Sequence, residues 1–485
     1  MNRREFSKRV LVGGAGLRAG SLLGRENGPE APRGDYYEEP ARRLPVADFD
    51  VVVAGGGTAG VVAALAAARQ GVRTALIEIK GYTGGTVVEG GTALHSFYNL
   101  WKAFPGVTKR QVVRGIPQEI VDRLTKAGGC SGHAEMDKGF GYDSVCTAID
   151  TELYKLVTME MLFEAGVRVA LNTRLVGAIT EGSRVKAAIA KSPSGRQALR
   201  AGTFVDCTAY GDLAAFAGAG YAEPDDYDCC NSVGIGNVDI DQVRDFMAKN
   251  GEIGQVALGT RSGEDGKVVR VGGSLGPEFS AEAERIGMSA VTTTVHDHYL
   301  MFIKCDYRVP GKVTDRDAMA RAELEVRKRM AKAVALFKKY VPGCEKAFMA
   351  RTSPSLSIRR GRQIICDYDI TRSDVLDGRH FEDDVMSYGF HDSAPRLQIK
   401  NGGAYGIPYR ALRVAGVENL LAAGMLITSD PEAHMSTRNT VSCMGQGQAA
   451  GTAAALSAAK KCGTRDLNYV GLRDALRNAG VYLES

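Results

Sequence analysis

The clearest hydrophobic pattern in the chain lies between residues 50 and 78. A β-branched run from Asp50 to Val53 precedes a glycine-rich turn and an alanine-rich stretch of helical composition. A second apolar run then leads from Thr74 to Ile77 and ends at Glu78. Two short apolar runs on either side of a helix-length segment are typical of parallel strands joined by a crossover helix. The pattern therefore predicts a strand–helix–strand unit.

Further along, periodic segments continue to alternate between helix and strand. Residues 111–125 and 150–165 have the spacing of amphipathic helices. Residues 166–208 alternate like strands joined by short turns, and a short helix is predicted from Leu213 to Ala219. This order of elements favours an α/β fold.

The middle of the chain is more polar. Residues 222–300 resemble an inserted unit, in which 250–280 is interpreted as loop-like because it is rich in glycine, serine and charge. Residues 315–340 predict a long helix, whose alternating charges are typical of a solvated face.

The C-terminal third returns to small apolar residues. Residues 419–424 predict a short buried strand, residues 430–440 a polar loop, and a tightly packing helix is predicted to begin at Gly445. Such small residues let a helix approach a flat ligand closely, although a close-packed core helix explains the same pattern.

The turn after the first strand has the spacing Gly55-x-Gly57-x-x-Gly60. In a dinucleotide-binding unit the first glycine permits the tight turn, the second lets main chain approach a pyrophosphate, and the third lets the helix pack on the sheet. The helix N-terminus offers free N–H groups to the phosphates, and Glu78 is placed to accept hydrogen bonds from a ribose. An acid at this position argues against a 2′-phosphate, so FAD or NAD is preferred to NADP.

Composition narrows the possible functions. The 485 residues are 44% hydrophobic and 24% charged, as in a globular protein of two or three structural units. No stretch approaches the roughly 20 uninterrupted apolar residues needed to cross a bilayer. The formal net charge of +5 is carried by residues 1–25, so the rest of the chain gives no electrostatic reason to expect a nucleic-acid partner.

The ten cysteines show no C-x-x-C pair and no spacing typical of a metal site. His296 and His298 resemble a metal-binding pair but lack a third ligand. We therefore expect no bound metal or iron–sulfur cluster, and we interpret the cysteines as small buried side chains.

The first residues resemble a twin-arginine export signal. Arg3, Arg4, Phe6 and Lys8 have its pattern, and an apolar segment, interrupted by Arg18, and a polar linker follow. We expect a periplasmic or secreted protein. The alternative is a cytoplasmic protein with a disordered basic N-terminus.

Five blocks, in order, resemble the FAD-dependent oxidoreductases related to the flavoprotein subunit of succinate dehydrogenase and fumarate reductase. They span residues 48–460 and comprise the strand–helix–strand unit with its acid, the loop GYTGGT, the segment FVDCTAYGDLAAFAGA, residues 341–371 and residues 405–456. The last block is the most specific, because its length and order are hard to reach by chance.

The resemblance implies a Rossmann-like FAD-binding domain of the glutathione-reductase and fumarate-reductase type, with an inserted α+β capping or substrate domain. The implied division is a signal and linker in 1–45, the first part of the FAD-binding domain in 46–221, the inserted domain in 222–350, and the rest of the FAD-binding domain in 351–485.

The resemblance also implies an FAD in extended form, with its pyrophosphate over the glycine turn, its ribose at the acid and its flavin near the start of the C-terminal helix. The implied FAD contacts are Gly55, Gly57, Thr58, Ala59, Gly60, Glu78, Gly84, Gly85, Thr86, Thr208, Gly211, Asp212, Gly424, Gln448, Ala449 and Ala450.

Two segments depart from the family pattern. Cys207-Thr208-Ala209 stands where Ala-Thr-Gly is usual, and Tyr210 replaces a small or acidic residue. We expect the methyl group of Ala209 to loosen the approach of main chain to the cofactor. The usual Ile-Arg-Glu-x-Arg appears as residues 358–362 without its acid, which removes an expected ion-pair partner of Arg359 and Arg362.

Hydride transfer at flavin N5 leaves one proton for a side chain to move. His434 and Arg438 lie in the predicted loop before the C-terminal helix, so we expect His434 to move the proton and Arg438 to orient the substrate. Arg438 and Arg359 are candidates to bind an anionic substrate group bidentately, and His391 is a weaker catalytic candidate.

Two functions remain open. The favoured one is an FAD-dependent oxidoreductase that acts on a small organic substrate, with an unknown electron donor or acceptor. The alternative is a flavin-bearing electron-relay subunit of a larger redox complex; a capping domain over the flavin would favour a substrate, and an open flavin edge a protein partner. A NAD-dependent dehydrogenase is a third possibility, which the last block disfavours. No second glycine motif with a following acid is present, so we expect no separate nicotinamide-binding domain.

Overall fold

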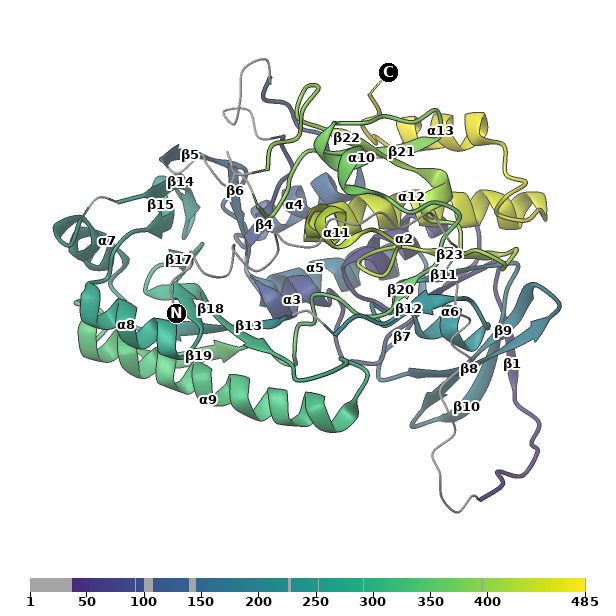
Figure 1. Cartoon of the computed structure of the whole chain (residues 1–485), viewed down its shortest axis with the longest axis horizontal. Coiled ribbons are helices and arrows are strands. Elements are labelled where there is room, and N and C mark those ends of the chain that lie inside the picture. Colours follow the sequence, from purple (N-terminus) through teal and green to yellow (C-terminus); the bar gives the residue numbers. More distant parts are fainter. Residues whose placement is uncertain are drawn as a thin grey trace, which may run out of the picture. The chain divides into compact units, whose positions relative to one another are not determined.

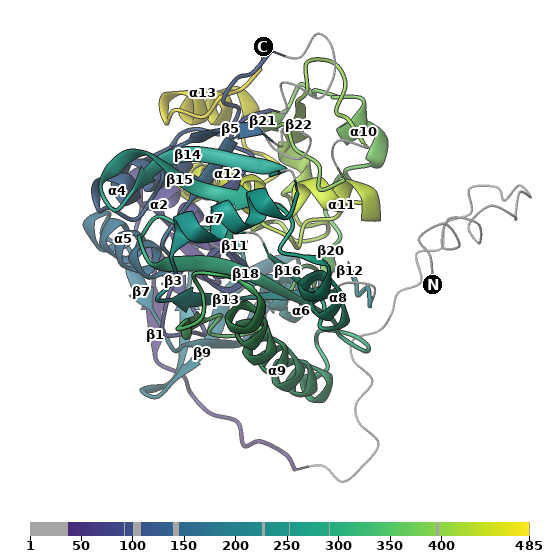
Figure 2. The same cartoon turned by 90° about the vertical axis from the view of Figure 1, so that its left-hand side faces the viewer.

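The computed structural model describes residues 37–91, 93–99, 108–138, 145–225, 228–251, 253–290, 292–393 and 397–484. The predicted twin-arginine signal lies outside the described residues. The chain divides into two compact units, Met1–Ala41 and Arg42–Ser485, and the second unit contains the elements that follow (Figure 1, Figure 2).

A five-stranded parallel sheet lies at the centre of this unit. Its order is β23 (Leu420–Ala422), β11 (Thr203–Asp206), β2 (Val51–Ala54), β3 (Thr74–Ile77) and β7 (Arg168–Ala170). Except for β7, these strands are buried along their whole length, as expected for a parallel sheet covered on both faces. The predicted strand–helix–strand unit is confirmed as β2, α2 (Thr58–Arg69) and β3.

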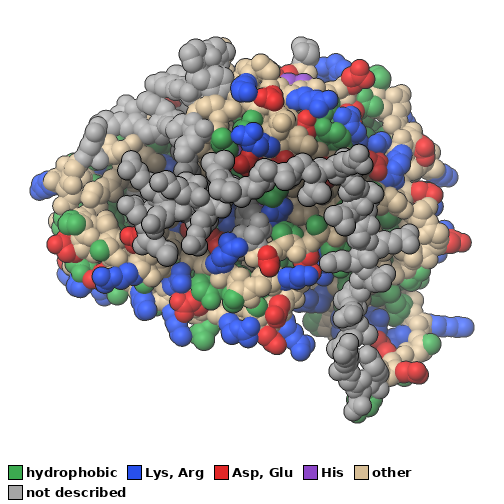
Figure 3. Space-filling view, viewed as in Figure 1, with side chains coloured by type: hydrophobic (Ala, Val, Ile, Leu, Met, Phe, Trp, Pro, Cys, Tyr) green, Lys and Arg blue, Asp and Glu red, His purple; other side chains and the backbone are tan. Residues whose placement is uncertain are grey.

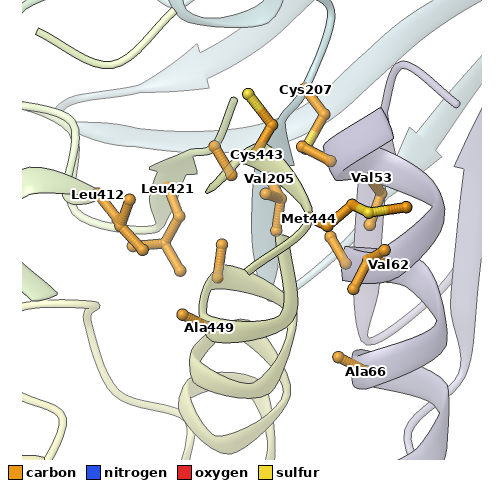
Figure 4. Close-up of a cluster of buried hydrophobic side chains, with 14 of the residues drawn as sticks. Val53, Val62, Ala66, Val205, Cys207, Leu412, Leu421, Cys443, Met444 and Ala449 are labelled. Atoms are coloured by element: carbon orange, nitrogen blue, oxygen red, sulfur yellow. The ribbon is translucent and has the colours of Figure 1, made fainter. Parts of the chain in front are cut away.

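Helices α2 and α12 (Thr440–Lys460) pack directly against each other, and Figure 4 shows them side by side with Val62 and Met444 among their buried side chains. A Cβ atom at Gly447 would lie 2.2 Å from the main-chain oxygen of Ala59, and one at Gly451 would lie 2.1 Å from that of Ala63. The small residues of α12 therefore serve close helix packing. The helix begins at Thr440, so its predicted start at Gly445 is wrong.

The predicted helices at 111–125 and 150–165 correspond to α4 (Ile116–Lys126) and α5 (Thr151–Glu164). The predicted strands at 166–208 correspond to β7, β8 (Arg174–Glu181), β9 (Arg184–Ser192), β10 (Gly195–Arg200) and β11. Strands β8, β9 and β10 form a mixed sheet with β1 (Val46–Asp48), which the sequence did not predict. Short helices α3 (Thr86–Gly90) and α6 (Asp212–Phe216) follow β3 and β11, and α13 (Tyr469–Asn478) packs against α12.

Two antiparallel sheets occupy the middle of the chain. One has the order β16 (Met288–Ala290), β18 (Tyr299–Arg308), β13 (Asp228–Gly236), β19 (Phe348–Thr352). The other has the order β17 (Thr292–Thr293), β15 (Glu264–Gly272), β14 (Gln255–Arg261), β5 (Ala134–Lys138), β6 (Val145–Ala148), β4 (Ala93–His95). With α7 (Ile240–Lys249), α8 (Pro277–Arg285) and α9 (Arg316–Tyr340), they enclose a second hydrophobic core. Because β4, β5 and β6 precede residue 222 in the chain, the boundary of an inserted domain at 222–350 stays a prediction.

The interpretation of residues 250–280 as loop-like is wrong. The strands β14 and β15 form a hairpin there, and α8 begins at Pro277. The turn of the hairpin lies between these two strands, where Ser262 and Gly263 have positive φ. Residues 268–271 of β15 are buried.

Helix α9 buries one stripe that includes Ala322, Val326 and Phe337. Outside this stripe the helix carries i,i+4 ion pairs such as that between Arg327 and Glu323. Figure 3 shows Lys, Arg, Asp and Glu side chains mixed along the lower edge, where α9 lies. The predicted solvated face is confirmed.

The C-terminal third contains small elements between β19 and α12. These are β12 (Tyr221–Ala222) with β20 (Gln363–Ile364), β21 (Asp384–Tyr388) with β22 (Tyr405–Pro408), the 3-10 helix Tyr409–Ala411, α10 (Arg372–Leu376) and α11 (Pro431–Thr437). Helix α11 replaces most of the predicted loop at 430–440. Asp430 caps it by accepting a hydrogen bond from the Ala433 N–H, and Pro431 occupies its first turn.

Within the described residues, no helix combines the length and apolar character needed to span a membrane.

Candidate active site

Two glycines of the turn between β2 and α2 are required by main-chain packing within the protein. Gly55 has φ +94°, and a Cβ there would lie 2.4 Å from the main-chain oxygen of Cys207. A Cβ at Gly60 would lie 1.7 Å from the main-chain oxygen of Gly55. A side chain at Gly55 would clash with the turn after β11, and one at Gly60 would push α2 away from the glycine turn.

The middle glycine of the motif has a different environment. Gly57 has φ −74°, which any residue adopts, and the nearest atom to an added Cβ would be the Cα of Gly85 at 3.7 Å. No side chain caps α2, and its first turn holds no acidic residue. The N-terminal N–H groups of α2 therefore remain available to an anion, and Gly57 leaves space beside them.

The loop at 84–86 is bonded to this turn. The Gly84 N–H donates to the Gly56 oxygen over 2.9 Å, and the Thr58 hydroxyl donates to the Gly84 oxygen over 3.0 Å. Gly85 has φ +51°. These contacts place the N-termini of α2 and α3 beside each other.

Glu78 lies at the end of β3, as predicted. Its carboxylate accepts hydrogen bonds from the N–H groups of Gly56, over 2.6 Å, and Lys80, over 2.8 Å. Burial raises the pKa of Glu78 above its usual value. The carboxylate is therefore held against the glycine turn.

The buried carboxylate of Asp206 organises the turn after β11. It accepts hydrogen bonds from the Thr208 N–H and hydroxyl and from the Ala214 N–H, and burial raises its pKa. Ala209 has φ +63°, in the left-handed region that favours glycine, which gives a physical reason for the glycine usual in the resembling family.

A first cavity of about 550 Å³ runs along these elements. The predicted cofactor residues in its lining are Gly55, Gly57, Thr58, Ala59, Glu78, Gly85, Thr86, Thr208, Asp212 and Gly424. Its lining also includes residues that the sequence did not single out as contacts: Cys207, Ala209, Tyr210, Met425 and Cys443. Three of them, Cys207, Ala209 and Tyr210, lie in the segment that departs from the family pattern. That departure is the sequence signal that could have identified them.

Six predicted cofactor residues lie outside this lining: Gly60, Gly84, Gly211, Gln448, Ala449 and Ala450. Gly60 and Gly84 are packed against protein, and a Cβ at Gly211 would lie 2.4 Å from the Ile364 side chain. The Gln448 amide bonds the Ile116 N–H and the Ala479 oxygen. Contacts within the protein account for these four residues, and Ala449 and Ala450 are buried in the hydrophobic core.

A second cavity, of about 640 Å³, adjoins the first. The two linings share Thr86, Ile358, Met425, Arg438 and Thr440. In this shared wall, Thr86 lies at the start of α3 and Thr440 at the start of α12. Ile358 belongs to the segment that follows β19, and Met425 to the segment that follows β23.

Two of the three predicted catalytic residues line the second cavity. The Arg438 guanidinium forms an ion pair with Asp392, and the Arg359 guanidinium lies 3.7 Å from the same carboxylate. Arg362 donates to Asp212 over 2.9 Å. Arg359 and Arg362 thus find acidic partners elsewhere in the chain, in place of the acid missing from their own motif.

His434 lines neither cavity. It is fully buried in α11, where its Nε2 lies 3.2 Å from the Arg359 oxygen, and burial lowers its pKa well below the usual value. The imidazole is therefore neutral, and its Nε2–H donates to that oxygen. Its predicted role in proton transfer stays a prediction.

His391 and His296, the weaker candidates, also form hydrogen bonds within the protein. His391 is buried, its Nε2 lies 2.9 Å from the Glu432 oxygen, and its Nδ1 accepts from the Ser393 N–H. His296 bonds Asp150 over 2.7 Å. No group of three or more His, Cys, Asp or Glu side chains among the described residues has the arrangement of a metal site.

The model of the family described as FAD dependent oxidoreductase matches residues 50–476. The chain belongs to this family. The oxidoreductase is also 39% identical over 75 residues to a 3-oxosteroid 1-dehydrogenase of Mycobacterium tuberculosis, a segment that covers 16% of this chain and 12% of the relative. The match thus spans about an eighth of the length of that curated relative.

Solved structures similar to the oxidoreductase share little sequence with it. A geranylgeranyl bacteriochlorophyll reductase-like protein from Thermoplasma acidophilum is 12% identical with a TM-score of 0.44, over 90% of this chain and 83% of the other. The p-nitrophenol 4-monooxygenase PnpA from Pseudomonas putida is 12% identical with a TM-score of 0.43, over 90% and 89%.

The cofactor of this oxidoreductase is FAD, and the first cavity has the features that this group requires. The N–H groups at the start of α2, with the space beside Gly57, suit a pyrophosphate, and Glu78 suits a ribose. A cavity that continues from this turn to Met425 and Arg438 leaves room for a flavin at the wall shared with the second cavity.

Proposed function

We propose that the oxidoreductase binds a small organic substrate in the second cavity, against the wall that this cavity shares with the first. The observation that carries the proposal is that five residues line both cavities. Bound FAD supplies hydride transfer to or from its N5 atom. The protein then has to hold the reacting carbon of the substrate beside this wall and keep water out.

Arg438 is the residue we assign to orienting the substrate. It belongs to the shared wall, its side chain is only 9% exposed, and its ion pair with Asp392 fixes the guanidinium. Arg359 approaches the same carboxylate from the other segment. Both guanidinium groups thus lie at the same carboxylate beside the shared wall, where they can donate hydrogen bonds to an acceptor group of the substrate.

We also propose that the FAD-binding fold is of the glutathione-reductase type and that the chain is related to the succinate dehydrogenase and fumarate reductase flavoproteins. The support is the combination of a five-stranded parallel sheet with the antiparallel strands β8, β9 and β10 inserted between β7 and β11. The departures at 207–210 and 358–362 distinguish this chain from the usual pattern.

The experiment is a visible spectrum of the purified holoprotein before and after anaerobic addition of candidate organic substrates. Bleaching of the flavin absorption by one of them, with reoxidation in air or by an electron acceptor, is expected. A flavin that no small molecule reduces, but that a redox protein partner reduces rapidly, would instead assign the electron-relay function.

Export by the twin-arginine route is a separate proposal that rests on the sequence alone. Changing Arg3 and Arg4 together to lysine should leave the protein in the cytoplasm, because the export receptor reads the arginine pair. Fractionation of cells that express the parent and this variant tests it, and an unchanged distribution between the fractions would contradict it.

A further inference from the structure

The lining of the second cavity holds four cationic side chains and one carboxylate. Its charged lining residues are Arg270, Lys304, Arg359, Arg438 and Asp392. Asp392 serves the two arginines near the shared wall, and Lys304 forms an ion pair with Asp306 over 2.7 Å. Asp306 does not line the cavity.

Arg270 differs from these cations because it has no acidic partner among the described residues. It lies in β15 and is only 4% exposed. Its Nε and Nη2 both donate to the amide oxygen of Gln255, over 3.1 and 2.8 Å. Its Nη1 is buried and makes no hydrogen bond within the described part of the chain.

A buried guanidinium with an unused N–H group is costly, because the charge loses water without gaining an acceptor. Gln255 fixes the plane of the guanidinium and neutralises none of its charge. Since Arg270 lines the cavity, a ligand anion there would supply the missing acceptor and the missing charge.

A second unused polar atom lies in the same lining. The Ser357 hydroxyl is buried and has no hydrogen-bond partner in the described structure, and this residue immediately precedes Ile358 of the shared wall. The cavity thus presents one unpaired cation away from the first cavity, at Arg270, and one unpaired hydroxyl next to the shared wall.

We propose that the substrate of this oxidoreductase is an organic anion whose acidic group is bound by Arg270, with Lys304 as a second cation in the same cavity. Neither residue lines the first cavity. The acidic group therefore binds away from the flavin, and the rest of the molecule extends to the shared wall. This inference rests on the proposed function of the second cavity.

The experiment uses the holoenzyme, because bound FAD fills the phosphate-binding turn of the first cavity. Inorganic sulfate is titrated by calorimetry at constant ionic strength maintained with chloride. The variants are Arg270→Met, Arg270→Lys and Arg261→Met. Arg261 is the matched control: it lies in the same hairpin, is also 4% exposed, lines neither cavity and already pairs with Asp297 over 2.8 Å.

We expect saturable sulfate binding by the parent. Arg270→Met should weaken it by about tenfold or more, since one charge-assisted contact is lost. Arg270→Lys, which restores the charge, and Arg261→Met should bind within a few-fold of the parent. Sulfate should also slow reduction of the flavin by substrate in competition with it.

An absence of saturable binding by the parent would overturn the inference, and so would equal affinity in Arg270→Met. The first outcome needs no variant to fold. Either result together with normal flavin reduction by a neutral substrate would overturn the anion subsite and leave the proposed function standing. A holoenzyme that no small molecule reduces would overturn the proposed function itself.

Discussion

Where the first cavity meets α2 it is shaped by main chain, whereas the second cavity is lined by charged side chains from distant parts of the sequence. Gly55, Gly57 and Glu78 belong to one continuous motif. In contrast, Arg270 and Arg438 come from a hairpin and from the end of α11. Main-chain geometry fixes a cofactor site for as long as the fold persists. A site made of side chains can change its ligand by substitution, without any change in the fold.

The largest effect on cofactor binding is expected at Gly57, because the space beside this glycine in the first cavity is free of side chains and is left to the cofactor. Gly57→Val should abolish FAD retention, because the backbone accepts the residue while its methyl groups occupy the pyrophosphate position. Flavin content of the purified protein measures it. Gly471→Val is the matched control, since an added Cβ there would also make only an ordinary contact, 3.8 Å from Lys460 Nζ.

Full flavin content in Gly57→Val would show that the pyrophosphate does not lie at the start of α2. Loss of flavin in the control as well would point to a general loss of stability.

A smaller effect is expected at Arg438, on the wall between the two cavities. Arg438→Leu should leave FAD bound and weaken substrate binding by roughly 10- to 150-fold, which corresponds to one charge-assisted contact of about 1.5–3 kcal/mol. Rapid-mixing flavin reduction over a range of substrate concentrations separates affinity from rate. Arg410→Leu, which breaks the ion pair with Asp383 away from both cavities, is the control. Unchanged affinity in Arg438→Leu would remove this residue from the substrate site.

The smallest effect is expected at His434, because its ring lies outside both linings and bonds the main chain of Arg359. His434→Ala should weaken substrate binding by less than about tenfold through loss of that hydrogen bond. His434→Gln, which keeps an N–H donor, should restore it. If His434 moves the proton, both variants would instead slow reduction at saturating substrate by roughly 10²–10⁴-fold. Reduction rates measured across pH decide between the two roles.

The same contrast explains what the sequence could predict. The strand–helix–strand unit was predictable because its glycines, apolar runs and Glu78 act through local geometry. The cofactor roles predicted for Ala449 and Ala450 stay predictions, because a small-residue helix looks the same whether it packs against a ligand or, as α12 does, against α2.

The second cavity could not be predicted, because it forms only when elements distant in sequence come together. The composition of residues 250–280 favours a loop, so the pattern does not place Gln255 and Arg270 on neighbouring strands. The available signal was Arg270 within the apolar run VVRV of β15, since a lone charge among buried β-branched residues requires a partner.

The most direct test of the account blocks the second cavity and leaves the first intact. Gly254 lies in the exposed lining of the second cavity only, and the nearest atom to an added Cβ would be the Gly272 oxygen at 3.9 Å. Anaerobic rapid mixing of Gly254→Phe holoenzyme with dithionite, and separately with the substrate that reduces the parent, gives the answer. We predict full FAD content, reduction by dithionite at the parent rate and loss of reduction by substrate. Reduction by substrate at the parent rate would contradict the placement of the substrate in the second cavity.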